Sequence, residues 1–178
     1  GDTIINPTNH AFFNLAGAAD ARDHILQVYA ENYAPKGDIG MPVGAIHPVA
    51  GTPMDFRQKR SLRAAMESDP SGFFGRIPRK YDDCFIFDKV GFGLGAELSH
   101  PANGRIMRVY TDMPAMVFFT PTFPLPGMGK PDKASSGYSS LCLETGFVPN
   151  AINCPQYKSP ICKKGQTFKY HTIYEIDS

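Results

Sequence analysis

The segment Ser140-Leu141-Cys142-Leu143-Glu144-Thr145-Gly146 has the alternation expected of a short β-strand that carries one acidic side chain. Successive side chains of a strand point to opposite faces, so the two leucines and the threonine share one face. Ser140, Cys142 and Glu144 share the other. The leucine face can pack on a core, and partial burial of Glu144 would raise its proton affinity toward the range of a general base. The alternative, and the commoner case for a lone acid, is a surface glutamate on an edge strand.

Four segments spread along the chain carry motifs that occur together in one enzyme family. They are Asn6–Leu15, Gly51–Arg57, Tyr81–Phe85 and Leu141–Thr145. The first resembles the central histidine motif of the aldose 1-epimerases, also called galactose mutarotases, and the last resembles the C-terminal glutamate signature of that family. One such motif is weak support, but four in the same order over the whole chain identify it as resembling this family.

The resemblance implies an all-β fold, a mostly antiparallel β-sandwich of the galactose mutarotase type, known as a supersandwich. Composition favours the same class, because 17 glycines and 16 prolines divide the chain into short segments. We expect one domain over residues 1–178. Relatives carry an additional N-terminal portion with an arginine and a second histidine that touch the sugar, so the resemblance implies an incomplete domain. A longer form of the same protein or a second chain would complete the sheet, whereas a short form folding alone would expose strand edges.

The pattern of apolar, β-branched and turn-forming residues predicts many short strands and one helix. Strands are expected over residues 3–13, 24–30, 83–88, 96–99, 105–111, 115–120, 140–146 and 167–176, and a helix over 61–68. Loops are expected over residues 33–48, 91–95, 123–138 and 149–160, with an Asn-Gly hairpin turn at 101–104. In the last strand, the side with Tyr174 and Ile176 is expected to face the core.

The resemblance also implies a chemistry. Mutarotation interconverts the α and β anomers of a free hexose such as galactose or glucose, and one acid and one base suffice for ring opening, without a cofactor or a metal. His10 matches the family acid and Glu144 the family base. Asp82 matches an aspartate that binds sugar hydroxyls, and Asn9 is expected to contribute to substrate binding. A histidine suits the acid role because its ordinary pKa lies near neutrality.

Each candidate has a plainer interpretation when taken alone. His10 among aromatic neighbours would more often be structural, and Asp82 beside Asp83 would more often be a solvated turn. Aromatic rings at Phe12, Tyr81 or Phe85 could form the floor of a sugar site, although core packing is the commoner role for any one ring. The remaining histidines match no catalytic position of the family and are expected to be structural or at the surface; they are His24, His47, His100 and His171.

Bulk properties exclude several classes of partner. The chain has 178 residues and a net charge of +1, with 42% hydrophobic and 20% charged residues. Such a balance is that of a globular protein and gives no broad attraction to nucleic acid or an anionic membrane. No apolar run approaches the roughly 20 residues of a membrane span, and no signal peptide is recognisable. The four cysteines lack metal-site spacing. We therefore expect reduced thiols in a cytoplasmic protein.

Three positions depart from the family pattern. Gly146 replaces a glutamine after the glutamate motif, Val117 replaces another glutamine, and Pro121 begins a segment that usually reads Gly-Asn. These changes remove hydrogen-bonding groups, which favours weaker sugar binding or a different sugar. They also leave two alternatives open: a non-catalytic carbohydrate-binding or regulatory member of the fold, and a hexose 6-phosphate epimerase.

Overall fold

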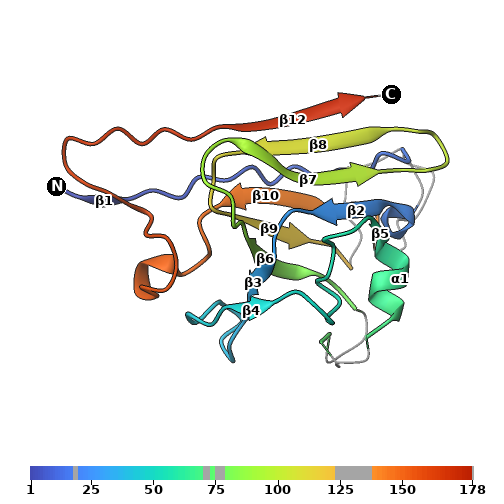
Figure 1. The fold of residues 1–178 in the computed structure, drawn as a ribbon, viewed down its shortest axis with the longest axis horizontal. Helices are drawn as coiled ribbons and strands as arrows, with labels where there is room; N and C mark the ends of the chain where they lie inside the picture. The colour runs from blue at the N-terminus through green and yellow to red at the C-terminus, as the bar shows by residue number, and fades with distance from the viewer. Residues whose placement is uncertain (18–19, 70–72, 75–78, 123–137, 178) are drawn as a thin grey trace.

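The protein, seen here as a computed structural model, is described over residues 1–17, 20–69, 73–74, 79–122 and 138–177. Two five-stranded antiparallel sheets face each other, beside a two-stranded ribbon (Figure 1). The first sheet has the order β10 (Cys142–Gly146), β9 (Ala115–Phe119), β6 (Asp82–Ile86), β3 (Asn32–Ala34), β4 (His47–Pro48). The second has the order β12 (Thr172–Asp177), β8 (Ile106–Thr111), β7 (Gly93–Ser99), β2 (Ile25–Val28), β5 (Arg60–Ser61). The ribbon pairs β1 (Thr3–Ile4) with β11 (Ile161–Cys162).

Helical structure is sparse, as predicted. The expected helix is present as α1 (Leu62–Glu67), and Ser61 caps it by accepting a hydrogen bond from the Ala64 N–H. Two short 3₁₀ turns are η1 (Ala21–Asp23) and η2 (Ala151–Asn153). No helix within the described ranges is long and apolar enough to cross a bilayer. The predicted all-β, mostly antiparallel sandwich is therefore confirmed.

The main core lies between the two sheets. The predicted alternation holds, because Leu141, directly before β10, and Leu143 within it are at most 1% exposed and pack into this core. The core draws large apolar side chains from both sheets, including Leu26, Phe85, Leu98, Met107, Phe118 and Leu143. Burial of this apolar area is the dominant stabilising term. It fixes which face of β10 turns inward, and so which face carries Glu144.

The opposite face of the first sheet is partly covered by the segment after β10. Side chains from this segment, among them Val148, Ala151 and Tyr157, pack on small residues of the sheet such as Ala34 and Cys84. All four cysteines are free thiols, as expected from their spacing. The cover lies over one part of the face, and Glu144 stands beside it on the same face.

The strand predicted over residues 3–13 is much shorter than expected. Only Thr3–Ile4 pairs as a strand, and Phe13 forms an isolated bridge with Leu141. The reason is local: Pro7 has no N–H to donate, and around it the side chains of Asn6 and Thr8 bond to the backbone of the neighbouring segment. Its β-branched composition correctly indicated an extended chain, but the chain does not form continuous strand pairing.

Two other predictions need correction. Residues 91–95 were expected to be a turn, yet β7 begins at Gly93 and contains a register shift after Leu94. A Cβ at Gly95 would come within 2.8 Å of the Phe87 ring, so the glycine permits close packing at this irregularity. The last strand covers only Thr172–Asp177, and on the side expected to face the core Tyr174 packs against it, whereas Ile176 is 58% exposed.

The remaining expectations are largely confirmed. The predicted hairpin at residues 101–104 joins the antiparallel strands β7 and β8, and the other strands agree with prediction to within a few residues at each end. The predicted loop over 33–48 contains the end of β3 and all of β4, and the loop over 149–160 contains η2. The predicted loop over 123–138 lies outside the described residues, except for Tyr138.

Candidate functional site

His10 reaches the site because its segment runs along the free edge of β10. Thr8 donates its hydroxyl hydrogen to the Thr145 carbonyl, 2.8 Å away. Asn6 binds the Phe147 backbone in both directions, accepting from its N–H at 2.8 Å and donating to its carbonyl at 3.2 Å. These side chains use backbone groups that an edge strand would otherwise leave unpaired. The segment is thereby held in an extended path that carries His10 past Glu144.

Two predicted site residues are in direct contact. His10 Nε2 lies 3.2 Å from Glu144 Oε1, with the histidine side chain 53% exposed and the glutamate side chain 11% exposed. Burial raises the pKa of Glu144, the positive charge available on His10 opposes that rise, and Asp82 adds to it. A shielded carboxylate with raised proton affinity therefore faces a half-exposed imidazole.

Cys142 lies on the other side of the His10 ring, a contact that the sequence analysis did not anticipate. Its Sγ is 3.6 Å from His10 Nδ1, and burial raises the pKa of the thiol to about 12. The thiol thus keeps its hydrogen and can donate it to Nδ1. An ionised Glu144 can only accept, so a hydrogen on His10 Nε2 can be donated to it.

Aromatic rings flank the imidazole. Phe12 and Phe119 lie 5.1 Å and 5.8 Å from His10 between ring centroids. Phe12 was one of the rings predicted to border the site, and Phe119 was not singled out. Tyr81 and Phe85, the other two candidates, are fully buried in the core, which is the plainer role weighed for them.

Asp82 lies on the same face as Glu144. Cross-strand register places Asp82 beside Phe119 and then Cys142, which puts it two strands from β10, roughly 10 Å across the sheet. Its carboxylate is 2.6 Å from Lys36 Nζ. The register places Asp83 on the opposite, core-side face, where burial raises its pKa. The two adjacent acids are therefore in different environments.

Asn9 occupies a local structural position. Its side-chain oxygen accepts a hydrogen bond from the Ala11 N–H at 2.8 Å, forming a short turn directly around His10. Gly146 has a packing reason as well, because a Cβ there would lie 2.9 Å from the Asn6 side-chain oxygen. Val117 pairs directly with Glu144 across the sheet and adds an apolar neighbour to it.

The other histidines lie apart from this pair. His24 is fully buried and bonded to backbone groups, accepting from the Leu15 N–H and donating to the Ala21 carbonyl. His171 pairs with Asp112 at the surface. His47 borders a cavity beside Asp82. His100 packs against the His24 ring.

Known proteins show the family to which this chain belongs. The family model described as Aldose 1-epimerase matches residues 1–175, and the chain belongs to that family. It is 33% identical to a galactose mutarotase from Rattus norvegicus over 98% of this chain and 50% of that protein. It is 31% identical to an aldose 1-epimerase from Escherichia coli over 97% of this chain and 50% of that protein.

Solved structures agree on the fold. A galactose 1-epimerase from Lactobacillus acidophilus superposes with a TM-score of 0.70 at 27% identity, covering 99% of this chain and 49% of that one. An aldose epimerase homologue from C. elegans gives a TM-score of 0.81 at 21% identity, covering 99% and 52%. The chain thus spans about half the length of the relatives it matches.

Proposed function

We propose that this protein is an aldose 1-epimerase that interconverts the α and β anomers of a free hexose such as galactose or glucose. The observation that carries the proposal is the contact between His10 and Glu144, 3.2 Å apart, in a chain of this family. Asp82 on the same face supplies a carboxylate for sugar hydroxyls. An acid, a base and a hydroxyl acceptor are the groups that this reaction requires.

The proposed reaction consists of two proton transfers. Ionised Glu144 takes the proton of the C1 hydroxyl while protonated His10 gives its Nε2 proton to the ring oxygen and is left as a neutral imidazole. The bond between C1 and the ring oxygen breaks, and C1 becomes an aldehyde carbonyl. Rotation about the C1–C2 bond presents the other carbonyl face. Closure then reverses both proton transfers and returns each residue to its starting state, so no group is consumed.

A sugar would separate the acid and the base, which are in direct contact here. In the complex, the anomeric centre lies between the two side chains, and each one exchanges its partner for a sugar oxygen within hydrogen-bond reach. His10 can move for this because it is half-exposed. In protonated His10 both ring nitrogens carry hydrogen, so the Nε2 hydrogen is available for transfer while the Nδ1 hydrogen faces Cys142 Sγ.

Further sugar contacts are proposed to come from residues beyond this chain, in a longer form of the protein or in a second chain. Two facts support this: the chain spans about half of each relative, and the side chains of His10 and Asp82 are 53% and 43% exposed. A covering segment would exclude water from the reacting centre and strengthen its electrostatics.

Polarimetry tests the proposal. Freshly dissolved α-galactose or α-glucose loses its initial optical rotation slowly in buffer, and micromolar full-length protein is expected to accelerate this loss. Sugar binding without acceleration would instead identify a carbohydrate-binding or regulatory member of the fold. The decisive control is the same protein with Glu144→Gln, because the two proteins differ only in the basic carboxylate.

A hexose 6-phosphate is the second candidate substrate, and one observation favours it. A cavity of about 400 Å³ adjoins Asp82, and three of its lining side chains, Lys36, His47 and Lys80, can carry positive charge. Comparing glucose with glucose 6-phosphate separates the candidates. If a phosphate occupies this cavity, Lys80→Met raises the KM for the phosphorylated sugar alone, whereas Lys59→Met, outside the cavity lining, leaves it unchanged.

A further inference from the structure

His10, Cys142 and Glu144 form a set of three different metal-binding donors. Cys142 and Glu144 are two residues apart on one face of β10, and His10 approaches them from the neighbouring segment. One donor atom from each residue, a nitrogen, a sulfur and an oxygen, lies within 4.8 Å of the other two. This is the one group of three such residues found in the part of the chain that the structure describes.

The three donor atoms lie within 4.8 Å of one another, a limit somewhat above the donor separations around a tetrahedral transition-metal ion. Bonds of about 2.0–2.1 Å to nitrogen, 2.3 Å to sulfur and 2.0–2.2 Å to oxygen place the donors roughly 3.3–3.6 Å from one another. The observed separations are 3.2 Å between His10 Nε2 and Glu144 Oε1 and 3.6 Å between His10 Nδ1 and Cys142 Sγ. These two contacts use different ring nitrogens, so the half-exposed ring must turn to offer one nitrogen to a shared ion.

The chemistry of the donor set selects the kind of ion. A thiolate and an imidazole favour Zn²⁺ and similar borderline ions, while Mg²⁺ and Ca²⁺ prefer oxygen donors throughout. Cys142 and Glu144 are already held on a paired strand, with Cys142 fully buried and the Glu144 side chain 11% exposed. The half-exposed His10 ring is the donor with the most freedom to adjust.

We propose that His10, Cys142 and Glu144 bind Zn²⁺, with a fourth position left for water, and that the bound ion blocks the epimerase site. On binding, the Cys142 thiol passes its proton to solvent, and a bond to zinc replaces the S–H bond. The ion occupies the same imidazole and carboxylate that would act on the sugar. The inhibitory consequence rests on the proposed function, whereas the binding itself does not.

The binding is tested with Co²⁺, whose bond to a thiolate gives a near-ultraviolet charge-transfer band. Titration of the full-length protein with Co²⁺ is expected to produce this band, and Zn²⁺ is expected to abolish it by displacement. Cys142→Ser should lose the band and weaken Zn²⁺ binding, measured by calorimetry, by at least about tenfold. The matched control is Cys162→Ser, which removes a partly exposed thiol outside the cluster and should retain both signals.

A second variant keeps the test decisive if Cys142→Ser fails to fold. His10→Ala removes a half-exposed side chain, and it should weaken Zn²⁺ binding to a similar degree while retaining the parent circular dichroism spectrum. The proposal is overturned if the parent protein gives no Co²⁺–thiolate band, or if Cys142→Ser or His10→Ala binds Zn²⁺ as tightly as the parent. A band lost in Cys162→Ser would also overturn it, because the thiolate ligand would then be Cys162.

Inhibition is measured separately. Zn²⁺ should raise the apparent KM for the sugar in polarimetry, and chelator should restore the parent value. If the protein binds Co²⁺ through Cys142 but never accelerates mutarotation, the proposed function fails and the metal site stands. If mutarotation is accelerated and Zn²⁺ neither binds nor inhibits, the metal site fails and the proposed function stands.

Discussion

Two histidines of this chain occupy opposite kinds of surroundings. Both ring nitrogens of His24 bond to the backbone, and its side chain is fully buried. Both nitrogens of His10 face side chains with exchangeable protons, a carboxylate and a thiol, and the ring is half-exposed. Burial lowers the pKa of His24. A ring whose two positions are fixed by the backbone supports the fold, whereas a ring between titratable groups can move a proton.

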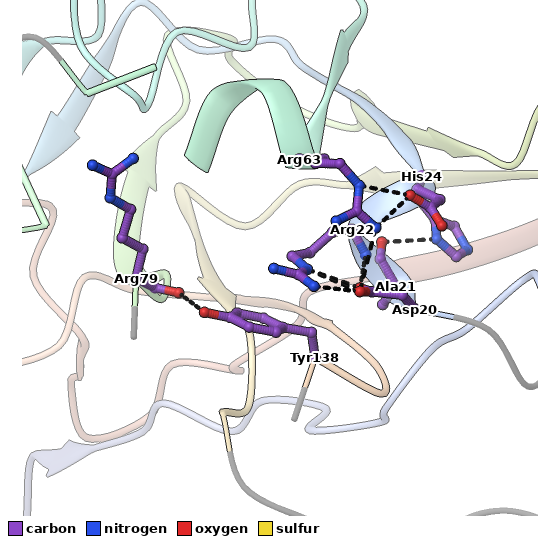
Figure 2. Close-up of polar contacts among 8 residues, drawn as sticks. Asp20, Ala21, Arg22, His24, Arg63, Arg79 and Tyr138 are labelled. Atoms are coloured by element: carbon purple, nitrogen blue, oxygen red, sulfur yellow. Dashed lines mark hydrogen bonds and ion pairs between the residues drawn. The ribbon is translucent and has the colours of Figure 1, made fainter. Parts of the chain in front are cut away.

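The residues near His24 form a network of hydrogen bonds and ion pairs that holds neighbouring segments in place (Figure 2). Asp20 accepts hydrogen bonds from Arg22, and Arg63 reaches both Asp20 and Asp23. Arg22 also lies over the ring of Tyr138, 4.2 Å from its centre. The network links η1 to α1 and to Tyr138. Its charges are matched in pairs, unlike the Glu144 carboxylate, which faces a half-exposed imidazole.

The largest expected effect separates the two regions by chemistry. Glu144→Gln keeps the shape of the side chain but removes the basic carboxylate. A positioned general base contributes about 10²–10⁴-fold in rate, so turnover should fall by that factor while sugar binding changes little. Thermal stability should stay near the parent value, because Leu141 and Leu143, on the other face, make the core contacts. Folded Glu144→Gln protein with parent activity would remove Glu144 from the mechanism.

The next effect separates the two regions by stability. His24→Ala leaves the buried Leu15 N–H without its acceptor, which should cost at least about 1–3 kcal/mol in the free energy of unfolding, with more from the cavity. His10→Ala should cost less than about 0.5 kcal/mol, as for most exposed positions, yet abolish most activity. Denaturant unfolding followed by circular dichroism measures both. Equal stability losses would show that His10 is as structural as His24.

The response to pH should also differ between the regions. The pKa of Glu144 is raised above 4.5, so activity should fall on acidification with a midpoint above that value, because the base becomes protonated. The pKa of His24 is lowered from 6.5, so below pH 6.5 the unfolded chain binds more protons than the folded one, and stability falls as pH falls. Glu144 contributes with the opposite sign, since its folded form holds the proton more tightly.

Two variants check these signs. His24→Gln should flatten the loss of stability below pH 6.5, and Glu144→Gln should steepen it, since a group that favours the folded state at low pH has been removed. Unfolding midpoints measured over a pH series give both slopes. An acid limb of the rate profile at or below pH 4.5 would contradict the raised pKa of Glu144.

The sequence predicted the fold better than the surroundings of the site. Alternation in the β10 segment correctly assigned its leucines to the core, because one buried face fixes register. The prediction of a continuous strand over residues 3–13 was wrong. The side chains of Asn6 and Thr8 make hydrogen bonds where a paired strand would use its backbone. Such substitutions depend on which strand lies alongside, and a single sequence does not contain that information.

The site residues show the same limit. His10 and Glu144 came from the family motifs, and the structure brings them together; their catalytic roles stay a prediction. Cys142 was placed on the Glu144 face by strand alternation, but its contact with His10 arises between segments 132 positions apart. Nothing in the sequence indicated that Lys36 pairs with Asp82, because this ion pair depends on how a loop residue approaches β6. Contacts across sheets and loops are set by tertiary structure, which spacing along one chain does not reveal.

The smallest expected effect concerns the ion pairs around His24. Arg63→Ala removes contacts of 3.3 Å with Asp20 and 2.7 Å with Asp23, but the Arg63 side chain is 37% exposed and solvent screens both pairs. The loss in unfolding free energy should be below about 1 kcal/mol and should shrink in high salt. Mutarotation should be unchanged, because no contact links Arg63 to His10 or Glu144. Arg63→Lys, the control, keeps the charge but loses the planar fork, so it should fall between the parent and Arg63→Ala. A loss of activity with stability intact would mean that this network positions the catalytic segment, and the contrast between a structural and a chemical histidine region would no longer hold.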